Sequence, residues 1–209
     1  MPAAPEDATP PAGAAPHRPP LSLALQADGW LPPGGPVLHR PSPNHDRRPE
    51  DEDPYLLVIH NISLPPGVFE GDAVIDFFQN RLDIAAHPWF ENIRDLRVSA
   101  HFLIRRDGRI VQFVPTTLRA WHAGVSAFQG RERCNDYAIG IELEGTDTTP
   151  YTGAQYAALN ALAAAICSRH PIRAACGHEH IAPGRKTDPG PAFEWGRLAG
   201  AAPLAPDLF

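Results

Sequence analysis

One short run of residues limits the fold of this chain more than any other feature. Residues 55–60 read YLLVIH, a continuous apolar segment that ends in a polar side chain. A strand with one exposed face alternates apolar and polar residues, so an unbroken run is typical of a strand covered on both faces. We therefore predict an inner strand of an α/β sheet. His60 lies at its end, where such sheets usually place their functional sites.

A β-hairpin is predicted over residues 101–114. Two apolar runs in this segment flank the dipeptide Asp107-Gly108. Asp-Gly between such runs favours a type I′ turn, because both central residues of that turn need positive φ.

A further strand is predicted over residues 137–144, which alternate with period two. One face carries the apolar side chains Tyr137, Ile139, Ile141 and Leu143. Gly140 and Glu142 fall on the other face. We expect the first face to meet the core and the second to be open to a ligand.

Two helices are predicted. Residues 72–81 place apolar side chains on one side, and the stronger helix follows Thr152, which forms a capping box with Gln155. The second helix ends before Pro171. Because strands and helices alternate and a hairpin is present, the predicted fold class is α/β, with a single mixed β-sheet flanked by α-helices.

Proline divides the chain into regions. Thirteen of the 25 prolines fall within the first 50 residues. Residues 1–22 consist mainly of alanine, proline and scattered polar groups, which bury too little surface to fold, so we predict a disordered tail. We predict an extended arm packed on the domain over residues 23–53, one globular domain over 54–198 and a C-terminal tail over 199–209.

Charge and cysteine content argue against several classes of function. The chain has 18 basic and 24 acidic residues and a formal net charge of −6, a poor match for nucleic acid or an anionic membrane. No apolar run reaches the roughly 18 residues of a membrane span. The first residues lack the pattern of a secretory signal. Three cysteines without a CxxC pair indicate reduced thiols, so we expect a cytoplasmic protein.

A candidate metal site combines the end of the first strand with a distant Gly/Pro-rich loop. His178 and Asp188 lie ten residues apart in that loop. Two imidazoles and one carboxylate are a common ligand set for catalytic zinc, with the fourth position open for water. Spacing alone is a weak signal, because any soluble protein has histidine and aspartate on loops.

Several longer motifs resemble one family. These are VIHNISLPPG (58–67), RVSAH (97–101), AWHAGVS (120–126), GRERCND (130–136), IGIELEGTD (139–147) and GRKTDPGPAF (184–193). In this order they closely resemble the AmpD amidases, which belong to the zinc amidases related to the phage T7 lysozyme amidase and to peptidoglycan recognition proteins. The resemblance runs from about Gly29 to Trp195 and implies the fold of that family, with residues 54–198 as the zinc amidase catalytic domain.

The resemblance implies a metal centre and two catalytic residues. His60, His178 and Asp188 fall on the three ligands of a Zn²⁺ ion in the family. Glu142 falls on the acidic residue that activates the attacking water, and Lys186 on the lysine that stabilises the transition state. A carboxylate suits proton transfer, and a fixed positive charge suits a developing oxyanion.

The resemblance also implies the substrate. Asn61, Arg97 and Arg133 fall on positions that look like substrate contacts, and arginine pairs bidentately with the carboxylates of a stem peptide. The bond cut is the amide between the lactyl group of (1,6-anhydro-)N-acetylmuramic acid and L-alanine, in cytoplasmic peptidoglycan recycling. We expect a monomer that acts on a small muropeptide and binds neither nucleic acid nor membrane.

Structural alternatives stay open for these residues. Glu142 also fits a solvent-facing carboxylate on a half-exposed strand, and Lys186 a solvated loop charge. Arg97 and Arg133 equally fit structural ion pairs. His180, two residues after the second predicted ligand, is a possible competitor for the metal. We expect it to point away, to the opposite side of an extended loop.

The pair Trp121-His122 has two interpretations. It lines the cleft, or it packs beneath a loop as an ordinary aromatic contact. His101 fits a histidine with satisfied hydrogen bonds at the start of a strand.

Two other functions compete with a cytoplasmic amidase. A non-catalytic peptidoglycan recognition module keeps the cleft but loses a zinc ligand, whereas this chain has all three candidates together with Glu142 and Lys186. An exported autolysin of the same fold acts on intact cell wall. The absence of a signal pattern and the odd number of cysteines argue against it.

Overall fold

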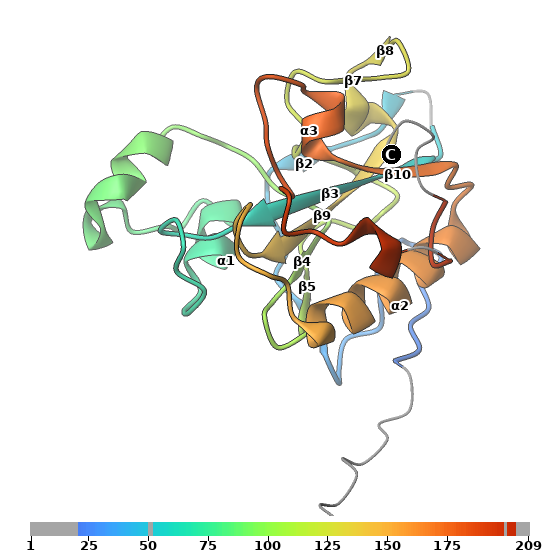
Figure 1. The fold of residues 1–209 in the computed structure, drawn as a ribbon, viewed down its shortest axis with the longest axis horizontal. Coiled ribbons are helices and arrows are strands. Elements are labelled where there is room, and N and C mark those ends of the chain that lie inside the picture. The colour runs from blue at the N-terminus through green and yellow to red at the C-terminus, as the bar shows by residue number, and fades with distance from the viewer. Residues whose placement is uncertain (1–20, 50–51, 199, 204–209) are drawn as a thin grey trace, which may run out of the picture.

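The protein is built around one mixed sheet of six strands (Figure 1). The structure, a computed structural model, describes residues 21–49, 52–198 and 200–203. In spatial order the strands are β1 (Val37–His39), β5 (Ile110–Gln112), β4 (Phe102–Ile104), β9 (Ala138–Glu144), β3 (Leu56–Ile62) and β10 (Ala174–Gly177). The predicted α/β class with a single central mixed sheet is confirmed.

The pairing of the strands makes β3 an inner strand, as its apolar run predicted. β3 is parallel to both β9 and β10. β4 and β5 form the predicted antiparallel hairpin. β3 continues to Ile62, so His60 lies inside the strand and not at its last position.

Short elements complete the fold around this sheet. The helices are α1 (Ala73–Phe78), α2 (Gly153–Arg169) and α3 (His178–Ile181). Among the elements that lie wholly within the described residues, 3-10 turns cover Ile84–Ala86, Pro88–Ile93, Cys134–Asp136 and Trp195–Arg197. Two small ribbons pair β2 (His45–Asp46) with β6 (Arg119–Ala120), and β7 (Ala127–Phe128) with β8 (Arg131–Glu132). No helix within the described ranges has the length and apolar character needed to cross a bilayer.

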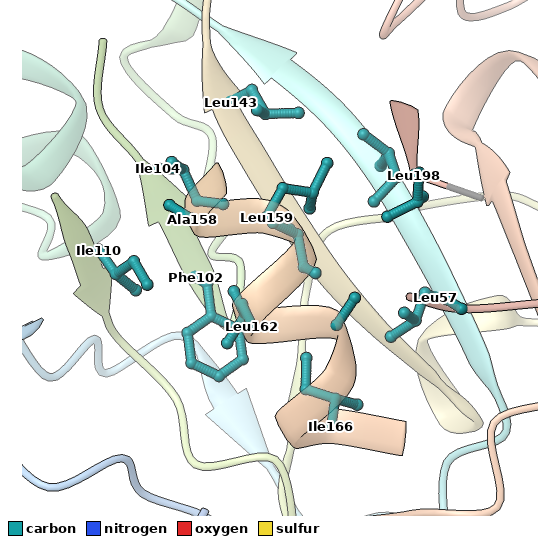
Figure 2. Close-up of a cluster of buried hydrophobic side chains, with 14 of the residues drawn as sticks. Leu57, Phe102, Ile104, Ile110, Leu143, Ala158, Leu159, Leu162, Ile166 and Leu198 are labelled. Atoms are coloured by element: carbon teal, nitrogen blue, oxygen red, sulfur yellow. The ribbon is translucent and has the colours of Figure 1, made fainter. Parts of the chain in front are cut away.

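Helix α2 covers one face of the sheet (Figure 2). It begins at the predicted capping box, in which the Thr152 hydroxyl accepts from the Gln155 backbone N–H at 3.0 Å. Leu159, Leu162 and Ile166 of the helix are fully buried against the strands. The helix and this sheet face therefore share one dry core.

The opposite face of the sheet is covered by shorter segments. Phe77 and Phe78 of α1 pack against Leu103 and Phe113 in a second apolar cluster. This cluster covers the hairpin end of the sheet. On the same face, Leu56 and Val58 of β3 and Ala138 of β9 belong to a third apolar cluster. The polar side chains farther along these two strands form the site described below.

Proline-rich residues before β3 lie against the domain. Leu21, Leu23 and Leu25 pack on the α2 core. The guanidinium of Arg48, 5% exposed, donates to backbone carbonyls that include those of Thr116 and Ala138.

The predicted ends of the chain are only partly within the described residues. Residues 1–20 of the predicted tail lie outside them, and the described part begins at Leu21. Near the other end, the Pro203 carbonyl accepts from the Ala175 N–H at 2.6 Å, so residues just before 204 lie along β10. Residues 199 and 204–209 lie outside the description. The domain boundaries stay predictions.

Candidate metal centre and cleft

Two parallel strands bring the first pair of candidate residues together. In the β3–β9 register His60 lies directly opposite Glu142. Side chains of neighbouring strands at the same register position point to the same face. The core side of β9 is occupied by its alternate residues, Ile139 and Ile141, so His60 and Glu142 share the polar face.

His178 reaches the same place from the edge strand. β10 pairs parallel with β3 up to Gly177 opposite Ile59, and His178 follows immediately as the first residue of α3. We predicted that His178 and Asp188 lie in one Gly/Pro-rich loop, and this prediction was wrong for residues 178–181, which form one helical turn. Sheet register therefore places His178 beside His60, and only Asp188 comes from the loop that follows.

The three candidate ligands converge on one point. The Nδ1 atoms of His60 and His178 lie 3.0 Å apart, and Asp188 Oδ2 lies 3.0 Å from the first and 3.2 Å from the second. Ligand atoms around a tetrahedral zinc at its usual bond lengths are about 3.3 Å apart. The three atoms thus form nearly the triangle that such an ion requires.

Hydrogen bonding on the far side of the His178 ring supports a cation. Its Nε2 lies 3.0 Å from the Ala123 carbonyl oxygen, which only accepts, so Nε2 carries the proton. In the neutral ring Nδ1 is then a bare lone pair, and it faces the Asp188 carboxylate. Two facing acceptors are stabilised by a positive ion between them, so the residues fit a divalent metal.

Burial sets the protonation of these groups. Burial lowers the pKa of His60 to about 4, although Asp188 raises it, so the ring is neutral near pH 7. Burial raises the pKa of Asp188, but the rings of His178 and His60 outweigh it and hold that pKa well below its usual value. Neutral imidazole and ionised carboxylate are the forms that ligate metals.

Glu142 is buried beside this cluster. The side chain is 8% exposed, and its Oε2 atom has no hydrogen-bond partner among the described residues. Burial raises the pKa of Glu142 well above its ordinary value, Asp188 raises it further, and Lys186 lowers it. The structural alternative of a solvent-facing carboxylate on a half-exposed strand does not hold, because every residue of β9 is buried.

A cavity of about 520 Å³ opens over the cluster. His60, Glu142, His178 and Asp188 line it together with Lys186, whose side chain is exposed. Apolar side chains also line it, among them Trp89, Ile93 and Leu96. The lining of the cavity therefore combines the polar cluster, the charge of Lys186 and apolar side chains.

The three predicted substrate contacts lie in different surroundings. Asn61 lines the cavity, where its amide donates to Asp147 Oδ1 at 2.8 Å. Arg133 lines a second hollow of about 600 Å³, and its Nε lies 3.1 Å from Asp136. Arg97 is exposed, and its guanidinium donates to the carbonyls of Arg94 and Leu96. Of the three, only Asn61 adjoins the metal cluster.

His180 points away from the cluster, as predicted. Its Nδ1 accepts from the Gly177 N–H at 2.9 Å, and its ring lies against Trp195. The reason differs from the predicted one, because the segment is helical and not extended. Residues two apart in a helical turn point about 200° apart, whereas in an extended segment they share a side.

His122 also lies near the cluster. It lines the cavity, with its Nδ1 2.9 Å from His60 Nε2. Of the two interpretations of Trp121-His122, the cleft position therefore holds for His122. The sequence alone left its role open, although the AWHAG motif drew attention to it.

Comparisons with known proteins agree with this architecture. The profile of the N-acetylmuramoyl-L-alanine amidase family (Amidase_2) matches residues 50–191. The 1,6-anhydro-N-acetylmuramyl-L-alanine amidase AmpD of Enterobacter cloacae is 59% identical over 176 residues, which cover 83% of this chain and 92% of that protein.

Two solved structures extend the likeness. A crystal structure of a selenomethionine derivative of AmpD superposes with a TM-score of 0.81 and 57% identity, covering 85% of this chain and 99% of the other. The amidase AmiD from Escherichia coli was solved in complex with anhydro-N-acetylmuramic acid-L-Ala-D-γ-Glu-L-Lys. It superposes with a TM-score of 0.54 and 33% sequence identity, covering 76% of this chain and 62% of the other. This chain therefore belongs to the N-acetylmuramoyl-L-alanine amidase family and, within it, to the AmpD group.

Proposed function

We propose that this protein is a zinc-dependent amidase that hydrolyses the bond between the lactyl group of (1,6-anhydro-)N-acetylmuramic acid and L-alanine of the stem peptide. The observation that carries the proposal is the convergence of His60, His178 and Asp188 within 3.2 Å of one another, beside a buried carboxylate and a lysine. AmpD relatives carry this activity in their name, and their identity to this chain supports the same reaction here.

His60, His178 and Asp188 would hold the ion through Nδ1, Nδ1 and a carboxylate oxygen. A zinc ion bound there supplies Lewis-acid polarisation of the scissile carbonyl and a lowered pKa for the attacking water. Burial keeps the His60 imidazole neutral, so that it offers a lone pair at neutral pH.

Glu142 is the proposed proton carrier. Its Oε2 is buried and unpaired among the described residues, so it is free to accept a proton from the attacking water. Burial raises the pKa of Glu142, while Lys186 and any bound cation lower it. These opposing effects bring the pKa toward the operating pH, where a carboxyl group can both accept a proton and give it back. The leaving amine of L-alanine takes that proton, so the carboxylate is regenerated.

Lys186 is the proposed electrostatic stabiliser. It lines the same cavity, and its charge lowers the pKa of both His60 and Glu142. A positive charge at this place favours the oxyanion that develops on the scissile carbonyl over the neutral ground state.

Asn61 is the proposed polar substrate contact closest to the reacting bond, because it follows His60 in β3 and lines the cavity. Arg97 and Arg133 stay proposed contacts for more distant carboxylates of the substrate. Arg97 would first have to release the two carbonyls it now binds.

The setting of the reaction is also proposed. The related amidase AmiD was solved with an anhydro-muropeptide as its substrate, which supports a small soluble muropeptide for this chain. Cys134, Cys167 and Cys176 are all free thiols, in keeping with the reducing cytoplasm. We therefore propose that a monomeric enzyme acts in cytoplasmic peptidoglycan recycling.

A digestion assay tests this function against its two competitors. Purified protein is incubated with anhydro-muropeptide and with intact sacculi, with and without chelator, and products are identified by mass spectrometry. Chelator-sensitive cleavage of the muropeptide without release from sacculi is expected. Binding without cleavage would indicate a recognition module, and release from sacculi would indicate an autolysin.

A further inference from the structure

Each candidate histidine ligand has a second ring nitrogen, and the partners of those nitrogens are adjacent in sequence. His60 Nε2 lies 2.9 Å from Nδ1 of His122, and His178 Nε2 lies 3.0 Å from the carbonyl oxygen of Ala123. One dipeptide, His122-Ala123, therefore contacts both imidazoles on the side away from the metal position.

This dipeptide is held from behind by one side chain. The Oδ1 atom of Asn135 accepts from the backbone N–H of His122 at 3.1 Å and from that of Ala123 at 2.8 Å. The guanidinium of Arg185 also donates to the Ala123 carbonyl at 2.8 Å. Both peptide units of the dipeptide are thus fixed by hydrogen bonds.

The His122 ring itself is tightly confined. It is 9% exposed and packs on Gly140, where an added β-carbon would overlap the ring. Its ring also meets that of His101 edge to face, with 5.8 Å between centroids. The ring is therefore closely packed between Gly140 of β9 and His101.

One ring nitrogen of His122 has no hydrogen bond within the described part of the chain, and this unfavourable feature indicates a functional role. Nε2 of His122 is buried and has no partner among the described residues. If His60 ligates through Nδ1, its Nε2–H donates to His122 Nδ1, and the orphan atom of His122 is then an unpaired N–H. A buried unpaired donor is unfavourable, so a structural role alone would favour an apolar side chain here.

We propose that His122-Ala123, anchored by Asn135, is the outer-shell clamp that orients both histidine ligands of the metal. His122 is a positioning residue: it fixes the tautomer and ring angle of His60, as the Ala123 carbonyl does for His178. The inference rests on the proposed function, because it presupposes the metal. It assigns a role to His122 and Asn135, which the catalytic scheme does not use.

Zinc affinity of the full chain tests the clamp. The apo protein is titrated with zinc against a chromophoric chelator, and the melting temperature of the apo form is recorded separately. His122→Leu should weaken zinc binding by about 10–100-fold, the usual effect of removing an outer-shell partner. His122→Asn should retain most of the affinity, because an asparagine amide oxygen can occupy the place of Nδ1.

A matched control separates positioning from general packing. His170 is 4% exposed and contacts Asp53 and Thr116, and none of its hydrogen-bond partners is a candidate ligand. His170→Leu should lower the melting temperature of the apo protein and leave zinc affinity unchanged.

Two variants of Asn135 test the clamp even if the His122→Leu protein does not fold. Asn135→Leu should weaken zinc binding, and Asn135→Asp, which keeps both acceptor contacts, should not. Wild-type zinc affinity in a folded His122→Leu or Asn135→Leu protein would overturn the clamp while the function stands. A wild-type chain that binds no zinc would overturn the proposed function itself.

Discussion

The two faces of strand β9 differ sharply, although their residues alternate along a single segment. On one face Ile139, Ile141 and Leu143 are fully buried in the core beneath α2. On the other, Glu142 is almost as well buried, yet one of its carboxylate oxygens has no partner among the described residues. Burial stabilises the first face and is unfavourable to the second.

Within this one strand, the apolar face contributes to stability and the polar face carries the proposed catalytic group. Apolar contacts of the α2 face hold the strand in register, and that register places Glu142 opposite His60. The polar face keeps groups that folding alone would disfavour. Substitutions on the two faces should therefore affect different measurements.

The largest effect is expected from removing a ligand. His178→Ala deletes one corner of the triangle of donor atoms, so bound zinc and activity should both be lost. Metal analysis and product formation check the result on the same preparation. Stoichiometric zinc in this variant would exclude His178 as a ligand.

Removal of the proposed base should spare the metal. Glu142→Ala is expected to retain zinc while kcat falls by about 10²-fold or more, because the variant lacks the proposed proton carrier. Steady-state kinetics and metal analysis give the two readouts. Near-normal turnover would remove Glu142 from the mechanism.

A substitution of Ile141, which neighbours Glu142 on the opposite face, should lower stability and leave kcat unchanged. Ile141→Ala leaves a cavity under α2 and should lower the free energy of unfolding by about 2–5 kcal/mol. Urea denaturation measures this loss, and kcat per folded molecule should stay near that of the wild type. A fall in kcat comparable to that of Glu142→Ala would contradict the separation of the two faces.

The polar face should also make stability depend on pH. Burial, and then the charge of Arg48, hold the pKa of His101 well below its usual value, so the folded protein excludes a proton that the unfolded chain binds. Stability is thus full above about pH 6.5 and falls by about 1.4 kcal/mol per pH unit below it for this group.

A variant isolates the share of His101 in that pH dependence. His101 Nδ1 accepts from the Gly140 N–H at 3.0 Å, and asparagine preserves an acceptor there. Urea denaturation of apo His101→Asn between about pH 7.5 and 5 should give a shallower decline than the wild type, because this residue no longer titrates. An equal slope in both proteins would show that His101 does not contribute.

The smallest effect is expected at the start of α2. Thr152→Ala removes the acceptor for the Gln155 N–H and should cost about 1 kcal/mol of stability. Thermal unfolding measures it, and turnover should not change, because the cap lies on the stabilising side of the sheet. Thr152→Ser keeps the hydroxyl and serves as the control.

Local sequence signals predicted most elements of the fold. The capping box, the Asp-Gly hairpin and the apolar run of β3 depend on neighbouring residues, and all three appear in the structure. The short helix after Gly177 was missed because its one turn lies among glycines and prolines that indicate a loop. Burial of both faces of β9 was missed because alternation suggests one exposed face.

The candidate site was only partly predictable. The family resemblance selected His60, Glu142, His178, Lys186 and Asp188, and these five residues line one cavity. It gave no reason to join His122 to His60, although Nδ1 of His122 lies 2.9 Å from Nε2 of His60 in the structure. For Arg97 the resemblance suggested a substrate contact, whereas in the structure its guanidinium binds neighbouring carbonyls.

By itself the sequence determined the main strands and helices, because these depend on local patterning, and its longer motifs, through the family resemblance, indicated which side chains can ligate or transfer protons. Only the tertiary structure decided that His60, His178 and Asp188 meet and that one dipeptide contacts both imidazoles. Such contacts depend on the register of parallel strands distant in sequence, and that register is set by packing on both faces of the sheet.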